Sequence, residues 1–177
     1  MSARGRLGGG AQRGFSLLEL VTALTIVLVA AGALLGRLRL YQEAAEKADM
    51  EYTVNTLRLA LQLRIAHDLG RQRPVDYAAV ARENPVSWLE APMKGYRGEP
   101  GPAEAALLPR GSWYFDRARG ELAYVPLRDS HLAADGPGSK RVRFKARLVR
   151  AVSGTGVFDA AAVGVTLGPM QPYRWLD

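Results

Sequence analysis

The sequence contains no cysteine and only two histidines, His67 and His131. Without cysteine the chain has no disulfides, no thiolate metal ligands and no thiol nucleophile, although an oxidising compartment such as the periplasm stays open to it. The two histidines stand far apart and in no metal-ligand spacing, and no phosphate-binding loop or nucleophile–base pair is recognisable. We therefore predict a protein that is not an enzyme and that has no cofactor and no metal.

Acidic residues are missing from the first fourteen positions, which contain Arg4, Arg6 and Arg13. The whole chain has 177 residues, with 24 lysines and arginines against 17 aspartates and glutamates, so the part after this leader keeps a net charge of +4. Such a mild excess is typical of a solvated surface and is only weak evidence for an anionic partner. About 140 residues follow the leader and the apolar run after it, enough for one domain with a modest core.

Charge is also nearly absent from Phe15 to Leu35, an apolar run of 21 residues whose one ionisable residue is Glu19. As a helix this run would be about 30 Å long, the thickness of the hydrocarbon core of a bilayer. The basic leader favours a cytoplasmic N-terminus, so the following domain would lie on the other side of the membrane. A carboxylate inside a membrane segment costs about 2.5–3.5 kcal/mol on insertion scales, so Glu19 requires an explanation.

Two ordinary interpretations of this segment are open. A secretory signal peptide has a shorter, charge-free apolar region of about 7–15 residues, although Ala31-Gly32-Ala33 could serve as its cleavage site. An uncleaved signal anchor would explain the length of the run but not the presence of Glu19.

A third interpretation accounts for the glutamate as well as the length. The residues Gly14-Phe15-Ser16-Leu17-Leu18-Glu19-Leu20 resemble the processing motif of type IV prepilins and type II secretion pseudopilins. In that motif a glycine precedes an apolar residue, and a glutamate stands five positions into the mature chain. The resemblance implies that prepilin peptidase removes the leader, residues 1–14, by cutting between Gly14 and Phe15, and that it methylates the new Phe15 amine. Residues 15–36 would then stay as a transmembrane and assembly helix.

The same resemblance bears on metal binding and on the type of subunit. Some major pseudopilins hold calcium in an acidic C-terminal loop, but Asp159 and Asp177 are isolated here, so we predict no calcium site. Many major pilins have a proline where this chain has Gly36, which favours a minor subunit.

The helical pattern continues beyond the apolar run and predicts one helix from Phe15 to about Leu69, ended by Gly70. Its amphipathic half, residues 37–70, has an apolar stripe of Leu38, Tyr41, Ala45, Ala48, Tyr52, Leu59 and Leu63. We expect Leu57, Leu61 and Ile65 to widen this face where a domain packs on the helix. The charged residues between them, Glu43 and Glu46 included, are expected on the solvated face.

Residues 71–177 have the pattern of a β-rich head. Ser112–Asp116 and Glu121–Val125 predict a hairpin, and Lys140–Val149 and Val163–Leu167 predict two further strands. In the loop-rich region before them, 85–89 predicts a short helix or turn with Trp88 buried, and Trp88 and Tyr96 suit packing better than ligand binding. We therefore predict an α+β fold, in which a long N-terminal helix packs on an antiparallel sheet of three or four strands, as in pilins.

One predicted strand carries a basic row on its outward face: Arg141, Arg143, Lys145 and Arg147, with apolar residues between them facing inward. This row is a candidate DNA-binding patch, and it defines an alternative function, that of a membrane-anchored periplasmic binding module. A solvated face, or pairing with acids of a neighbouring subunit, explains the same row without DNA.

The favoured prediction is a non-catalytic structural subunit, a minor pilin or pseudopilin of a type IV pilus or type II secretion filament. It would be a single-pass protein of the bacterial inner membrane, with the leader in the cytoplasm and the head in the periplasm. Its partners would be prepilin peptidase, the inner membrane and other pilin or pseudopilin subunits. Glu19 would pair with the Phe15 amine of its own or a neighbouring chain and so set the axial register of the subunits.

Overall fold

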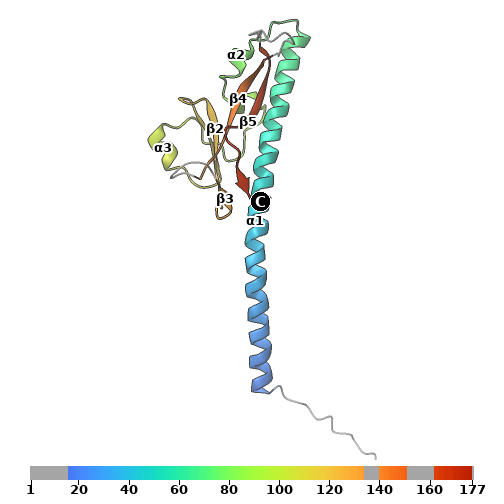
Figure 1. The fold of residues 1–177 in the computed structure, drawn as a ribbon, viewed down its shortest axis with the longest axis vertical. Coiled ribbons are helices and arrows are strands. Elements are labelled where there is room, and N and C mark those ends of the chain that lie inside the picture. Colours follow the sequence, from blue (N-terminus) through green and yellow to red (C-terminus); the bar gives the residue numbers. More distant parts are fainter. Residues whose placement is uncertain (1–15, 134–139, 151–161, 177) are drawn as a thin grey trace, which may run out of the picture. The chain divides into compact units, whose positions relative to one another are not determined.

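The structure, a computed structural model, describes residues 16–133, 140–150 and 162–176. The chain divides into two compact units, Met1–Leu40 and Tyr41–Asp177. Helix α1 (Leu17–Gly70) begins in the first unit and ends in the second (Figure 1). The predicted end of this helix beside Gly70 is confirmed, whereas its predicted start at Phe15 lies outside the described residues.

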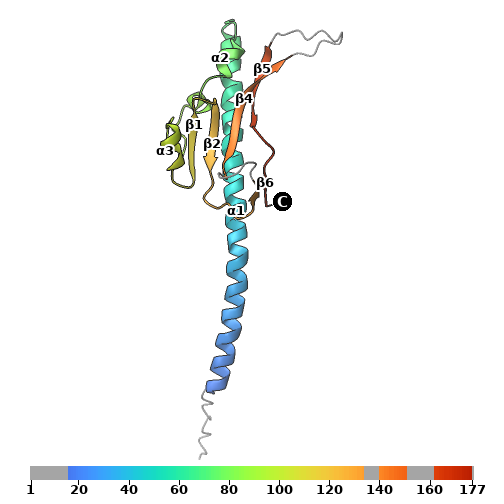
Figure 2. The ribbon, with the colours of Figure 1, turned by 60° about the vertical axis from the view of Figure 1, so that its left-hand side comes forward.

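The second unit contains a four-stranded antiparallel sheet with the strand order β1-β2-β4-β5 (Figure 1, Figure 2). Its strands are β1 (Ser112–Asp116), β2 (Glu121–Val125), β4 (Val142–Arg150) and β5 (Ala162–Pro169). The first two form the predicted hairpin, and the other two correspond to the two further strands predicted from the sequence. The predicted α+β fold is thus confirmed.

The inner face of this sheet consists of alternate residues of each strand, because successive side chains of a strand point to opposite faces. In the hairpin, Trp113 lies opposite Tyr124 with the two ring centroids 4.7 Å apart. On the next pair of strands, Leu122 lies opposite Phe144. All four side chains are buried, so this face of the sheet forms the core.

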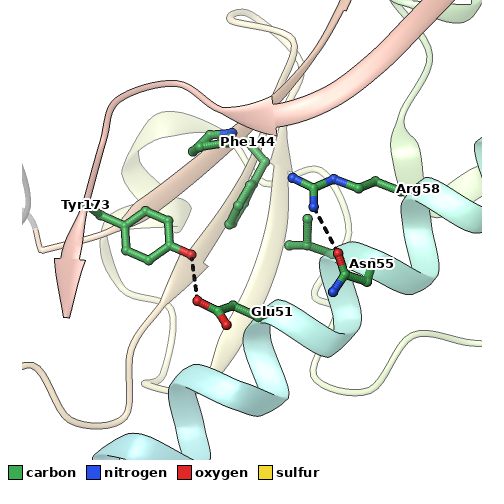
Figure 3. A pocket seen from close by; sticks show the side chains of 7 residues that line it. Glu51, Asn55, Arg58, Phe144 and Tyr173 are labelled. Atoms are coloured by element: carbon green, nitrogen blue, oxygen red, sulfur yellow. Dashed lines mark hydrogen bonds between the residues drawn. The ribbon is translucent and has the colours of Figure 1, made fainter. Parts of the chain in front are cut away.

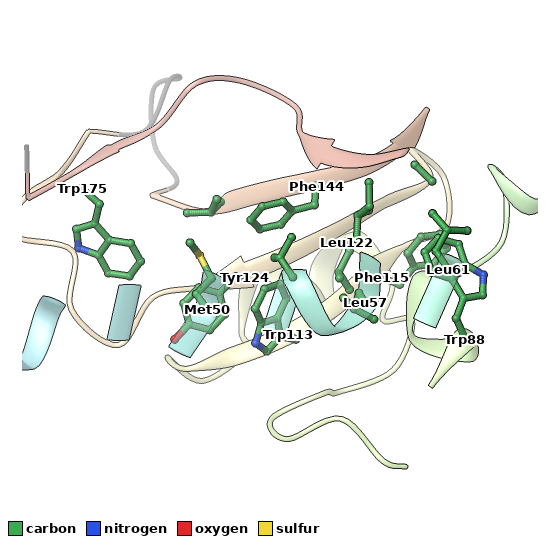
Figure 4. Packing of buried hydrophobic residues seen from close by; sticks show 14 of the residues in the cluster. Met50, Leu57, Leu61, Trp88, Trp113, Phe115, Leu122, Tyr124, Phe144 and Trp175 are labelled. Atoms are coloured by element: carbon green, nitrogen blue, oxygen red, sulfur yellow. The ribbon is translucent and has the colours of Figure 1, made fainter. Parts of the chain in front are cut away.

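One face of α1 covers the inner face of the sheet (Figure 4). Its buried apolar residues, Met50, Val54, Leu57 and Leu61, follow one another at three- and four-residue spacing, which keeps them on one side of a helix. The prediction that the domain packs on Leu57 and Leu61 is confirmed.

The apolar stripe predicted along α1 does not face the core, so this part of the prediction was wrong. Tyr52, Leu59 and Leu63 are 72%, 56% and 63% exposed. Glu43 and Glu46, which were expected on the solvated face, are buried instead, at 2% and 7% exposed. This half of the helix has apolar residues on two sides, and periodicity alone does not tell which side meets the sheet.

A second, two-stranded sheet joins two segments in which no strand was predicted. β3 (Leu132–Ala133) pairs antiparallel with β6 (Arg174–Trp175). Trp175 is fully buried, and its carbonyl oxygen accepts a hydrogen bond of 3.0 Å from Nζ of Lys47 on α1. Two-residue strands have no repeating pattern that sequence reasoning could detect, so this attachment of the C-terminal segment was missed.

The described residues also form three short helices outside the sheets: α2 (Tyr77–Val80), η1 (Pro85–Trp88) and α3 (Pro102–Ala106). The 3₁₀ helix η1 confirms the short helix or turn predicted there, and its Trp88 is buried. The side chain of Asn84 caps η1, since its oxygen accepts a hydrogen bond of 3.0 Å from the backbone N–H of Val86. Helices α2 and α3 were not predicted.

Candidate functional site

Helix α1 begins with a cap formed by Ser16, whose hydroxyl accepts a hydrogen bond of 3.2 Å from the backbone N–H of Glu19. A serine followed three residues later by a glutamate is the capping-box pattern of a helix start. The Glu19 carboxylate lies in the first turn, where the helix dipole favours negative charge. Glu19 therefore has a local structural role in addition to any role in assembly, and sequence analysis overlooked this pattern.

The helix segment around Glu19 presents an apolar surface. Its large apolar residues between Leu17 and Leu35 are 52–81% exposed. The hydroxyls of Thr22 and Thr25 donate hydrogen bonds of 2.8 Å to backbone carbonyls four residues earlier, so neither threonine presents an unsatisfied donor. By length and composition α1 could cross a membrane, with a mean hydropathy of 2.3 over its apolar window.

Residues 10–35 match the family model of the prokaryotic N-terminal methylation motif, which is the signal of the type IV pilin family. The motif indicates a type IV pilin-like or pseudopilin precursor. The matched range contains the predicted processing residues Gly14 and Phe15, which lie outside the described residues, and Glu19, which lies in the first turn of α1. No curated protein and no solved structure matches this chain.

The head of the chain contains a buried carboxylate, Glu46, with three hydrogen-bond donors. The hydroxyl of Tyr124 donates to it at 2.9 Å, and the backbone N–H groups of Leu127 and Arg128 donate as well, the latter at 3.1 Å. A buried carboxylate is tolerated only when such donors replace its water. Glu46 thereby fixes the segment that follows β2 to helix α1.

Glu43, one turn earlier on α1, is buried against His131. It accepts a hydrogen bond of 3.3 Å from the backbone N–H of His131 and lies 3.0 Å from the Nδ1 atom of that residue. Burial raises the pKa of Glu43, but the hydrogen bonds from His131 and from the Ser130 side chain outweigh burial and hold the pKa below its usual value. The ionised form of Glu43 is therefore part of the folded head.

A sequence signal for the two glutamates does exist. Glu43, Glu46, Met50, Val54 and Leu57 follow one another at spacings of three, four, four and three residues, the spacing of a helix face. Charged side chains are rarely buried unless they are paired, so composition favoured the solvated face. Their partners come from residues about 80 positions later in the chain, which no local pattern specifies.

The basic row consists of Arg141, just before β4, and Arg143, Lys145 and Arg147 within it. It lies on the face of the sheet opposite the core, and each of its cations donates to an acceptor of its own chain. The acceptors are the Tyr114 hydroxyl and the Ala105 carbonyl for Arg141, the Glu121 carboxylate for Arg143, the Arg119 carbonyl for Lys145 and the Pro169 carbonyl for Arg147, at 2.7–3.1 Å. The row thus helps to hold the outer face of the head together. DNA phosphates would compete with these acceptors, so DNA binding by the row stays a prediction without separate support.

A small pocket of about 230 Å³ lies beside α1 (Figure 3). Glu51, Asn55 and Arg58 line it from the helix, and Tyr173 lines it from the C-terminal segment. Arg58 donates to Asn55 at 2.9 Å, and the Tyr173 hydroxyl donates to Glu51 at 3.4 Å. The bond between Tyr173 and Glu51 attaches the C-terminal segment to the helix, and the polar groups that line this pocket are used within the chain.

Within the described ranges, no group of three or more His, Asp or Glu side chains is placed to hold a metal ion. Asp159 and Asp177, which were considered for calcium, lie outside those ranges. Trp88 donates to Glu83 at 2.9 Å, and the Tyr96 hydroxyl accepts from Asn84 at 2.6 Å. These bonds within the chain support the packing role predicted for the two aromatic residues.

Proposed function

We propose that this chain is a non-catalytic minor subunit of a type IV pilus or type II secretion filament. The observation that carries the proposal is the methylation motif at residues 10–35, which overlaps the start of a helix long and apolar enough to cross a membrane. The α+β head with a long N-terminal helix is the architecture that such subunits would share. The glycine at position 36, where many major pilins have proline, supports the minor role.

The proposed maturation has two chemical steps at one position. Prepilin peptidase hydrolyses the peptide bond between Gly14 and Phe15 on the cytoplasmic side of the inner membrane and releases residues 1–14. The same enzyme then transfers a methyl group from a methyl-donor cosubstrate to the new Phe15 amine, which gives up a proton. The three arginines of the leader keep this end in the cytoplasm, and the head is displayed in the periplasm.

Glu19 is proposed to set the register of the subunits in the filament. Cleavage gives Phe15 a positively charged amine, and Glu19 follows it by about one helical turn. In a helix bundle that excludes water, an amine and a carboxylate that face each other compensate their charges. Any register that separates them leaves uncompensated charges, which is strongly unfavourable. The pair would therefore select one axial position for each new subunit.

The test of this function is the intact mass of the protein extracted from the membrane of its host. A chain that starts at a methylated Phe15 would support processing and filament assembly. A chain that starts at Met1 would contradict processing and favour an uncleaved anchor. A start near Leu34 would contradict it in favour of an ordinary signal peptide.

A pair of Gly14 variants tests the cleavage chemistry separately. Gly14→Ala should be processed better than Gly14→Leu, because a peptidase that accepts glycine there has little room for a larger side chain. Equal processing of both variants would contradict the requirement for a small residue at this position.

A further inference from the structure

An apolar groove of about 1020 Å³ lies on the side of α1 that faces away from the sheet. Tyr52, Leu59 and Leu63 form its floor, and the segment Trp88–Met93 forms a wall. The three floor side chains are more than half exposed. Large apolar side chains gathered in one exposed place commonly mark a binding surface.

Five residues of α1 that line the groove have the spacing of the contact positions between two paired helices, and we call this stripe the seam. Tyr52, Thr56, Leu59, Leu63 and Ala66 are separated by four, three, four and three residues, and all five line the groove. This alternation is the spacing by which two α-helices interlock their side chains along a shared stripe. The seam covers about 21 Å of helix, and the charged Asp49 ends it on the N-terminal side.

The wall of the groove is held in place by Glu83. Its carboxylate accepts a hydrogen bond of 2.8 Å from Arg64 and another of 2.9 Å from Nε1 of Trp88. The pairing compensates the positive charge of Arg64 at the rim. The groove is therefore preformed, and its one arginine is already paired.

The exposure of the floor favours a macromolecular occupant. A small-molecule site buries most of its ligand in an enclosed cavity, whereas Tyr52 is 72% exposed. A long open stripe on a helix suits another helix better than a compact ligand.

The residues beside the seam favour an identical partner. They are Thr53, Ala60 and His67 on one side and Asn55 and Gln62 on the other. None of these five is an acid, a lysine or an arginine, and the His67 ring lies 3.6 Å from Asp68 of its own chain. Flanking charges usually decide which helix pairs with which, and like charges there keep identical helices apart. Two copies of this seam would meet without such repulsion. Copies inserted through the same N-terminal segment would also have the same direction, as a parallel pair requires.

We propose that the groove is a docking surface for a second copy of this chain. The two α1 helices pair in parallel through the seam from Tyr52 to Ala66, with Leu59 and Leu63 facing their counterparts. The proposal rests on the membrane insertion contained in the proposed function, and it adds a homotypic contact in the head to the contacts of the N-terminal segment.

Cysteine crosslinking of the full chain in membranes tests the pairing, because the natural chain has no cysteine. Leu59→Cys and Leu63→Cys, oxidised separately with copper phenanthroline, should each give a disulfide-linked product of twice the monomer mass. The matched control is Ala118→Cys in the exposed turn between β1 and β2. Its yield of dimer should be several-fold lower than that of the seam variants.

A charge introduced at the seam provides a second measurement. In the Leu63→Cys chain, Leu59→Glu should lower the yield of dimer several-fold, whereas Ala118→Glu should leave it unchanged. Equal crosslinking at positions 63 and 118, no effect of Leu59→Glu, or a product of any mass other than twice the monomer would each overturn the proposal.

Failure of the membrane premise can be told apart from failure of the groove. Alkaline carbonate extraction of the same samples shows whether the chain is inserted in the membrane. Release of the chain by carbonate would contradict the proposed membrane insertion. The yield of dimer, measured in the fraction that contains the chain, would still decide whether the helices pair.

Discussion

The hydroxyl of Tyr124 donates a hydrogen bond of 2.9 Å to the carboxylate of Glu46, and this bond joins strand β2 to helix α1 inside the head. Both residues are buried. Burial, followed by the nearby charge of Glu46, raises the pKa of Tyr124 far above its usual value, so the phenol keeps its proton. Tyr124 is therefore a neutral hydrogen-bond donor to Glu46 over the whole physiological range.

Replacement of Glu46 by alanine should destabilise the head. The substitution leaves the Tyr124 hydroxyl and the N–H groups of Leu127 and Arg128 without their acceptor, and each such buried donor is costly. We expect the free energy of unfolding to fall by about 2–3 kcal/mol. Tyr124→Phe, which removes one donor, should cost about 1 kcal/mol. Urea unfolding of the full chain in detergent, followed by tryptophan fluorescence, measures both.

The matched control for Glu46→Ala is Glu90→Ala, which removes the same group from an exposed position. It should change the free energy of unfolding by less than about 0.5 kcal/mol. Similar losses in the two variants would mean that burial of Glu46 contributes nothing to stability.

The depressed pKa of Glu43 makes the stability of the head depend on pH in the acidic range. A carboxyl whose pKa is lower in the folded than in the unfolded chain stabilises the fold above the ordinary glutamate pKa near 4.5. This contribution is lost as the pH falls through the folded pKa. The advantage of the natural chain over Glu43→Gln should therefore shrink between about pH 5.5 and about pH 3, below the range in which histidines usually titrate.

Unfolding curves of the two chains at several pH values within this window provide the measurement. A control is Glu90→Gln, which makes the same change at an exposed position. If the difference in the free energy of unfolding between the natural chain and Glu43→Gln stayed constant as the pH fell, the ionised form of Glu43 would not stabilise the fold.

The elements with a repeating pattern were predictable from the sequence, and those without one were not. The β1–β2 hairpin was predicted from its two strands, and the alternation over β4 specified both the strand and its inward face. β3 and β6 have two residues each, too few for any period. The buried face of α1 was half predictable, since Leu57 and Leu61 were assigned correctly while Glu43 and Glu46 were not.

The N-terminal motif was predictable because it depends on neighbouring residues alone. Gly14, Phe15 and Glu19 are recognised by their spacing along a short stretch of sequence. The match to residues 10–35 covers the same stretch. The groove on α1 could not be foreseen, because it depends on which of two apolar stripes faces the sheet. That choice is made by contacts with residues such as Trp113 and Phe144, which lie far along the chain.

Gly95 should tolerate alanine less well than Gly98. Both glycines have positive φ angles, +75° and +83°, which cost any other residue about 1 kcal/mol. A Cβ atom on Gly95 would also lie 2.9 Å from the carbonyl oxygen of Gly111, whereas nothing lies within 4 Å of one on Gly98. Gly95→Ala should therefore lower the melting temperature clearly more than Gly98→Ala. Equal shifts in the two variants would contradict the close approach of the Gly95 and Gly111 backbones.

Removal of the Glu19 charge should impair filament assembly while folding and processing continue. Glu19→Gln keeps the helix cap, because the Ser16 hydroxyl receives its hydrogen bond from the backbone N–H of residue 19 and not from the side chain. The substitution therefore isolates the carboxylate, whose loss leaves the Phe15 amine uncompensated wherever subunits pack without water. We expect a normal mature mass, a normal melting temperature of the head and a several-fold lower amount of the chain in sheared filaments. Ser16→Ala, which weakens the cap by about 1 kcal/mol but keeps the charge, is the control and should still assemble. Normal incorporation of Glu19→Gln would show that the carboxylate serves only to start the helix.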